Sequence, residues 1–313
     1  MTSKGTVGKR FGQAFRCLGL LVPLLASVPA AGAPADAAQL REEVARMAED
    51  WLALRPMQGF LHPMDLAEAY HWQDAFVAEL EPTLGPVVGW KTGGHDRGPG
   101  FPVFPPEGIR AQLLAGQFRE DGTAIRLEDT RAGFLEADLA FRVGSTAIHD
   151  AETDLELLAA LDALVPFAEV PDPWYDPATR SVNGTIVANM STRFSFTGTP
   201  VPIEATEAWL ARIRSFTFLV RDEHGTVIQT GAIAHWYDPI AVVRWLRDHL
   251  VSSGKRLEPG QLLSLGNIGI LRQLHEGSPR GPAYQSDRFT LEYHGLVDGP
   301  PPSVTIAIDR SPR

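Results

Sequence analysis

The sequence predicts an α+β protein in which a short helical segment precedes a β-rich domain. Helical patterns come first after residue 38, and strand patterns then follow one another in runs. Strict alternation of strands and helices would instead indicate a doubly wound parallel sheet. The chain has 313 residues, 44% of them hydrophobic and 21% charged, which is typical of a globular protein with one large domain or two small ones.

Two amphipathic helices are predicted at the start of this region. Apolar residues recur at helical spacing over Leu40–Leu54, and a second helix is predicted at Met64–Leu80. Asp65 complements the dipole in the first turn of the second helix, and Pro82, Gly85 and Pro86 are expected to break its pattern. Further helices are predicted at Asp154–Leu161 and Pro239–Val251.

Short apolar or alternating runs bounded by turn residues predict the strands. They are expected at Val87–Lys91, Phe134–Val143, Leu164–Val170, Thr185–Phe196, Phe216–Arg221, Val227–Ala232, Leu262–Leu265, Arg288–Tyr293 and Ser303–Ile308. We therefore expect residues 38–85 to form the helical segment and residues 86–313 to form a β-rich catalytic domain.

The N-terminal residues have the order typical of a secretory signal peptide. Basic residues, an apolar run and a stretch of small residues follow one another at Lys4, Lys9, Arg10, Arg16, Leu18–Val28 and Ala30–Ala38. The apolar run is shorter than the roughly 20 residues of a membrane-spanning helix. We expect residues 1–37 to be removed, at a cleavage site that competing small-residue patterns leave open, and the product to be periplasmic or secreted with no membrane association. Cys17 is the single cysteine, so the mature chain would hold no disulfide or thiolate ligand.

The charge balance limits the choice of partners. The formal net charge is -10, whereas nucleic-acid binding requires clustered Lys and Arg to neutralise phosphates. No glycine-rich phosphate loop follows a strand and opens a helix, so nucleotide cofactors are not expected. A small-molecule substrate remains as the expected partner.

Three carboxylates are candidate metal ligands. Side chains alternate along a strand, so Glu136 and Asp138 point to the same face, where they repel each other unless water or a cation screens them. Glu169 ends an apolar run, where a charge is costly unless it is paired. Three carboxylates without His or Cys suit a hard cation such as Mg²⁺ or Mn²⁺. A solvent-exposed strand face for the first two, and a strand end or a buried salt bridge for the third, are the alternatives.

Lys91 is a candidate substrate-binding residue. It ends an apolar strand just before Gly93 and Gly94, where the backbone can approach a ligand closely. As a point charge it could polarise a carbonyl or hold a carboxylate. A lysine that extends its ammonium to water at a strand edge is the alternative.

The order of these motifs resembles the 2-keto-4-pentenoate hydratase branch of the fumarylacetoacetate hydrolase family. The matching motifs are Gly-aromatic-Lys-x-Gly at residues 89–93, acid-x-acid at 136–138, Val-Pro-x-x-Glu at 165–169, Asn with small hydroxyl residues at 189–192, and Leu-x-Pro-Gly at 257–260. The resemblance extends from about Leu40 to the C-terminus.

The resemblance implies a mixed-sheet, β-rich core of the family's C-terminal type, preceded by helices. It implies that Glu136, Asp138 and Glu169 hold Mg²⁺ or Mn²⁺, that the metal chelates a 2-keto acid, and that the site stabilises an enolate-like intermediate. Lys91 matches the substrate lysine, with a catalytic and a binding role. Asn189, Thr192 and Asn267 are the further substrate-binding candidates that it indicates, and we also expect a homo-oligomer.

The sequence departs from the branch at several positions. Asp138 stands where Glu is usual, and Asn267 lies in a terminal loop that usually offers Ser and Thr. The upstream acid thought to move protons is replaced by Ile109-Arg110-Ala111, which leaves Glu107 as the nearest acid and the candidate proton donor. We expect a metal-dependent hydro-lyase that adds water to a small 2-hydroxydienoic acid. A C–C hydrolase or decarboxylase on the same metal core, or an exported binding protein without catalysis, is the alternative.

Overall fold

The computed structural model describes residues 36–94, 105, 108–176, 179, 181–277 and 282–311. The predicted signal peptide lies outside the described residues except for Asp36 and Ala37, and Glu107 also lies outside them. Asp36 caps the first helix by accepting a hydrogen bond from the Ala38 backbone N–H at 2.9 Å. In the part of the chain that the structure describes, no helix has the length and apolar character needed to cross a membrane.

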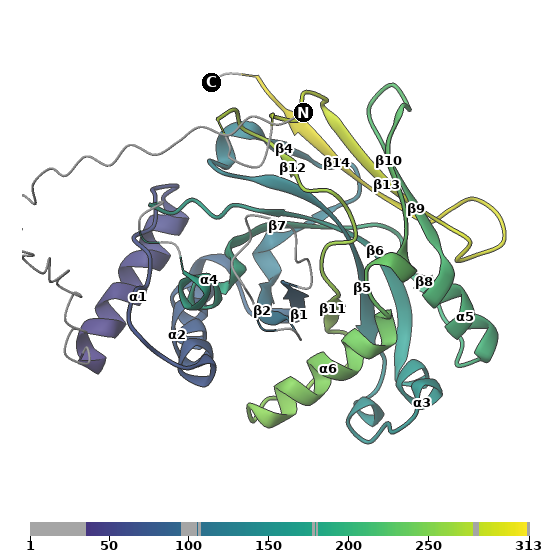
Figure 1. Cartoon of the computed structure of the whole chain (residues 1–313), viewed down its shortest axis with the longest axis horizontal. Coiled ribbons are helices and arrows are strands. Elements are labelled where there is room, and N and C mark those ends of the chain that lie inside the picture. Colours follow the sequence, from purple (N-terminus) through teal and green to yellow (C-terminus); the bar gives the residue numbers. More distant parts are fainter. Residues whose placement is uncertain are drawn as a thin grey trace, which may run out of the picture. The chain divides into compact units, whose positions relative to one another are not determined.

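The described chain contains helices and two β-sheets (Figure 1). The helices are α1 (Ala37–Leu52), α2 (Leu66–Leu84), α3 (Asp154–Ala159), α4 (Val182–Val187), α5 (Glu207–Ser215) and α6 (Pro239–Ser252). The large sheet contains β1 (Val87–Gly93), β2 (Ile109–Leu114), β3 (Phe118–Glu120), β5 (Phe134–Val143), β6 (Leu161–Pro171), β7 (Thr192–Thr197), β8 (Val201–Pro202), β11 (Leu262–Ser264) and β12 (Arg272–Gln273). The smaller sheet contains β4 (Ala124–Arg126), β9 (Thr217–Arg221), β10 (Val227–Ala232), β13 (Arg288–His294) and β14 (Ser303–Asp309).

Both sheets are mixed. The main path of the large sheet is β2-β1-β11-β5-β6-β7-β3, with β12 paired to β5 and β8 to β6, and the smaller sheet has the order β10-β9-β13-β14-β4. The pairs β1–β11, β3–β7 and β4–β14 are parallel, and the neighbouring pairs are antiparallel. The α+β class with a mixed-sheet core and preceding helices, predicted from the sequence, is confirmed.

The main apolar core lies between one face of the large sheet and the smaller sheet. Leu139 and Phe196 from the large sheet share it with Phe218 and Leu291 from the smaller one. A separate apolar cluster joins α1 and α2 to β2 and α4. The opposite face of the large sheet carries only a small apolar cluster, which leaves room there for polar side chains.

The structure corrects the predicted strand Thr185–Phe196 and the predicted break at Pro82. The predicted strand Thr185–Phe196 begins instead as helix α4, and only its last part forms β7. Ser181 caps α4, and three consecutive residues with positive φ (Asn189, Met190 and Ser191) separate α4 from β7. Pro82 does not break α2, because it lies in the last turn, where the Gly85 N–H still bonds the Glu81 carbonyl at 2.8 Å.

Candidate metal and substrate site

Neighbouring strands of the large sheet bring the predicted metal ligands to one face. Glu136 on β5 stands directly opposite Glu169 on β6, and Asp138 lies two residues further along β5 on the same side. On the other flank, Lys91 of β1 stands beside Ser264 of β11. The side chains that were predicted from separate motifs on β1, β5 and β6 therefore lie on one face of the sheet, with β11 between β1 and β5.

Apolar side chains surround these charged residues and keep most of them from contact with water. Alternate positions on β5 and β6 supply Ala140, Ala163, Val165 and Phe167 to the small cluster on this face, and the neighbouring strand β2 adds Leu113. Lys91, Asp138 and Glu169 are 1%, 0% and 0% exposed. A charge cluster with so little access to water requires mutual compensation or a bound ion.

Lys91 supplies the positive charge among these side chains. Its Nζ donates a hydrogen bond to Glu169 Oε2 and lies 4.0 Å from Glu136 Oε2. Burial would lower the pKa of Lys91, but the carboxylates of Glu169 and Glu136 outweigh that effect and raise the pKa above its usual value. The lysine is held as a cation, which contradicts the alternative of an ammonium extended to water at a strand edge.

Asp138 is held from two sides. Its Oδ1 accepts a hydrogen bond from the Leu139 N–H at 2.5 Å, and its Oδ2 accepts one from the Ser264 hydroxyl. Burial raises the pKa of Asp138 well above its usual value, and the nearby Glu169 charge raises it further. A charged Asp138 therefore needs more positive charge than Lys91 supplies.

The residues present fit a hard divalent cation. Glu169 Oε1 is buried and has no hydrogen-bond partner among the described residues, so it is a carboxylate oxygen with an unused lone pair on the acidic face. As the side chains lie, no group of three or more Asp, Glu, His or Cys among the described residues surrounds one point, because Glu169 turns to Lys91 and Asp138 to Ser264. The donor types, their shared face and the excess of negative charge nevertheless match what Mg²⁺ or Mn²⁺ requires.

Solved structures of other proteins share this fold. Over 88% of this chain and 100% of the other, the structure is similar to 4-oxalocrotonate decarboxylase from Pseudomonas putida G7 complexed with magnesium and adipate, with a TM-score of 0.70 and 19% identity. The same enzyme complexed with calcium and acetate covers the same shares, with a TM-score of 0.68 and 18% identity. The chain has the fold of the fumarylacetoacetate hydrolase family. No protein-family model matches the sequence, and no curated protein matches it.

Within this family fold, two of the other predicted binding residues, Asn189 and Asn267, bond neighbouring backbone groups. Asn189 accepts a hydrogen bond from the Gln112 N–H at 2.7 Å and donates one to the Gln112 carbonyl at 2.8 Å, which ties the turn after α4 to β2. The Thr192 hydroxyl, by contrast, is buried and has no hydrogen-bond partner within the described part of the chain. The Asn267 side chain bonds the backbone of Gly269, accepting from its N–H at 3.0 Å. Their roles in substrate binding stay predictions, as does that of Glu107.

Sequence reasoning missed Tyr293, which lies behind Asp138. This tyrosine belongs to β13 of the smaller sheet, and its hydroxyl accepts a hydrogen bond from the Phe167 N–H at 3.0 Å. The same hydroxyl lies within donating distance of the Asp138 and Phe167 carbonyls. It therefore bridges β5 and β6 at the level of the carboxylates. A predicted strand contained Tyr293, but no signal in the sequence pointed to this contact across two sheets.

Ser195 was also missed. It stands opposite Glu169 in the β6–β7 register, and no described residue forms a hydrogen bond with its buried hydroxyl. Alternation along the predicted strand, combined with the register, would have placed Ser195 on the site face. It adds a second unused polar atom beside Glu169.

Proposed function

We propose that this chain is a divalent-metal-dependent lyase of small 2-keto acids, of the 2-keto-4-pentenoate hydratase branch of the fumarylacetoacetate hydrolase family. The observation that carries the proposal is the meeting of Glu136, Asp138 and Glu169 with Lys91 on one buried face. The motif order and the family fold support the choice of chemistry.

Glu136, Asp138 and Glu169 would hold Mg²⁺ or Mn²⁺. The magnesium bound by 4-oxalocrotonate decarboxylase, which has the same fold, supports this choice. When bound, the ion would act as a Lewis acid toward the carboxylate and 2-oxo oxygens of the substrate and would stabilise the negative charge that an enolate carries. Glu169 would leave Lys91 for the ion, which would free the ammonium.

Lys91 would then hold the substrate. Its ammonium, already charged and buried, would donate to a carboxylate or 2-oxo oxygen at the position that Glu169 Oε2 now occupies. Ser264 would keep Asp138 oriented through its hydroxyl. The apolar side chains of the face, including Val165 and Phe167, would pack on the carbon chain and exclude bulk water.

Two reactions suit this arrangement. Hydration of a 2-hydroxydienoate is the one that the motif order favours. Decarboxylation is the second candidate, because the similarity to 4-oxalocrotonate decarboxylase extends over the whole length of that chain. Both reactions place negative charge on the same oxygens, so the residues described above serve either one.

Two further expectations are part of the proposal. The order of basic, apolar and small residues before Asp36 supports export to the periplasm or the medium. A homo-oligomer is proposed on the sequence resemblance.

The decisive experiment combines binding with turnover. Calorimetry with Mg²⁺ and oxalate, a non-reacting 2-keto acid mimic, should show binding to the parent that is lost in Glu169→Gln. Asp162→Asn is the matched control, because Asp162 lies on the same strand but pairs with Arg142 at the surface. Equal binding by all three proteins would refute the metal site.

Turnover then separates the reactions. Loss of the dienoate absorbance of 2-hydroxypenta-2,4-dienoate would support hydration, and release of CO₂ from 4-oxalocrotonate would support decarboxylation. Metal and oxalate binding without turnover on a panel of 2-keto acids would contradict the lyase and indicate an exported binding protein.

A further inference from the structure

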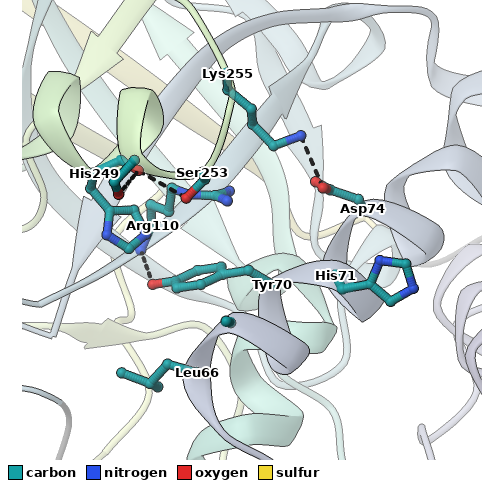
Figure 2. Close-up of a pocket in the computed structure, with 10 residues that line it drawn as sticks. Leu66, Tyr70, His71, Asp74, Arg110, His249, Ser253 and Lys255 are labelled. Atoms are coloured by element: carbon teal, nitrogen blue, oxygen red, sulfur yellow. Dashed lines mark hydrogen bonds and ion pairs between the residues drawn. The ribbon is translucent and has the colours of Figure 1, made fainter.

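A pocket lies away from the carboxylate face. It has a volume of about 560 Å³ and is formed by α2, β2 and the end of α6, with Tyr70, Asp74, Arg110, His249 and Lys255 among its lining residues (Figure 2). Arg110 follows the opposite alternation to Ala111, the β2 residue paired with Lys91, so the pocket lies behind the sheet as seen from the predicted metal ligands. None of the residues assigned above to metal or substrate lines it.

Arg110 is a buried cation that forms no ion pair with a carboxylate in the part of the chain that the structure describes. Its side chain is 1% exposed, and its Nη1 donates to the neutral amide oxygen of Gln73 at 3.0 Å. Its Nε has no hydrogen-bond partner, and no acid among the described residues forms an ion pair with it. The guanidinium carbon lies 4.3 Å from the centre of the Tyr70 ring and 5.3 Å from that of Trp90. Aromatic faces compensate a buried charge only in part, so this arrangement favours a bound anion.

The charge balance of the pocket is positive. Lys255 pairs with Asp74 at 2.9 Å, and Asp74 also accepts a hydrogen bond from Gln112 at 2.8 Å. Asp74 is the one acid among the described residues that line the pocket, against the two cations Arg110 and Lys255. Figure 2 shows Arg110 between the His249 end of α6 and the Lys255–Asp74 pair. One excess positive charge suits a ligand with one negative charge rather than two.

The walls suggest the rest of the ligand. Leu66 adds apolar surface to the pocket, and the ring of Tyr70 offers aromatic surface beside the guanidinium. A volume of about 560 Å³ exceeds what an inorganic anion needs and is in the range of small organic ligands. A planar carboxylate also matches the geometry of a guanidinium edge.

We propose that this pocket binds a small organic monocarboxylate, with the carboxylate against Arg110 and Lys255 and the carbon skeleton beside Tyr70. The site is separate from the metal site and does not rest on the proposed lyase activity. The two sites share strand β1, because Trp90, which lies beneath Arg110, directly precedes Lys91.

The test uses benzoate as the probe and calorimetry on the full chain. Parent protein should bind benzoate at millimolar or lower concentration without added metal. Arg110→Gln should weaken binding by about 10- to 100-fold, which is the range of a lost charge-assisted hydrogen bond. Lys255→Gln should weaken binding to a smaller extent. Arg256→Gln is the matched control, because it removes the same charge one residue away at an exposed position outside the pocket.

A variant that should bind benzoate more tightly keeps the test valid even if the Arg110→Gln protein does not fold. Asp74→Asn keeps the acceptor for Gln112 but removes the charge that occupies Lys255, so it should tighten benzoate binding. No benzoate binding to the parent, or equal affinities in Asp74→Asn, Lys255→Gln and the parent, would overturn the proposal. Inorganic phosphate binding more tightly than benzoate would overturn the monocarboxylate class.

Discussion

Lys91 and Glu169 form a hydrogen-bonded ion pair in the interior of the protein, with side chains 2% and 0% exposed. Glu136 lies 4.0 Å from the same ammonium, so one lysine compensates two carboxylates directly. A pair of this kind is costly to break from one side, because the remaining charge stays buried. It is also the part of the site that a metal ion would rearrange.

We therefore expect Lys91→Met to destabilise the protein and Mg²⁺ to restore part of the loss. In metal-free buffer, the free energy of unfolding should fall by about 3–5 kcal/mol, since the carboxylates lose their cation. Added Mg²⁺ should stabilise this variant more than the parent. Urea unfolding with and without Mg²⁺ measures both effects.

The control for this variant is Lys255→Met. Lys255 and its partner Asp74 are 27% and 39% exposed, and such pairs contribute at most about 1 kcal/mol. The fall in unfolding free energy of Lys255→Met should be small and independent of Mg²⁺. A Lys91→Met protein as stable as the parent would show that the pair does not compensate the acids.

Tyr293→Phe should loosen β5 and β6 at the carboxylates. The change leaves the buried Phe167 N–H without its acceptor, which costs about 1–3 kcal/mol in unfolding free energy. Mg²⁺ affinity should fall as well, because the Asp138 backbone loses a contact on the opposite face of the sheet. Denaturant unfolding and calorimetry are the measurements. Tyr284→Phe, which loses a hydroxyl bonded to the exposed Arg288, should leave the affinity unchanged.

Gly89→Ala should separate β1 from β11. A Cβ at this position would lie 2.4 Å from the Leu262 carbonyl oxygen, which is backbone and cannot move aside alone. The strands must shift, so Lys91 moves relative to Ser264, and we expect loss of stability together with loss of oxalate binding. Gly122→Ala is the comparison, because its φ is positive but its surroundings are open. It should cost only about 1 kcal/mol and leave binding intact. Similar oxalate affinities in both variants would contradict the role of close strand packing.

His249 should make stability depend on pH in the acid range. Burial lowers the pKa of His249 from 6.5 to about 4, and the Arg110 charge adds to the effect. Between these two values the unfolded chain binds a proton that the folded protein does not, so stability falls as the pH drops from about 6.5 toward about 4. The slope should stay below about 1.4 kcal/mol per pH unit, because the ring is partly exposed and solvent screens it.

Unfolding of His249→Gln over the same pH range tests this origin. The variant should show a shallower slope than the parent. His224→Gln should keep the parental slope, because the His224 side chain is 78% exposed. Identical slopes in all three proteins would show that His249 is not the responsible group.

The strands were predicted best where their patterning is strictly local. Phe134–Val143 and Val227–Ala232 begin and end as predicted, because alternation and turn residues mark them. Strand β2 was not predicted, since the polar Arg110 and Gln112 interrupt its apolar pattern. Those side chains are buried because α2 packs over them, where Gln73 accepts a hydrogen bond from Arg110 and Asp74 accepts one from Gln112. The helix α4 was missed for a similar reason, as its residues favour strands locally.

The sequence by itself determined which residues share a face and which motifs belong together. Side-chain alternation put Glu136 and Asp138 on one side, because the direction of a side chain follows from the covalent geometry of its own strand. Only the tertiary structure decided that Glu169 stands opposite Glu136, that Lys91 bonds Glu169, and that Arg110 lies buried beside a pocket. Register and burial arise from contacts between segments far apart in the chain, and no local pattern records them.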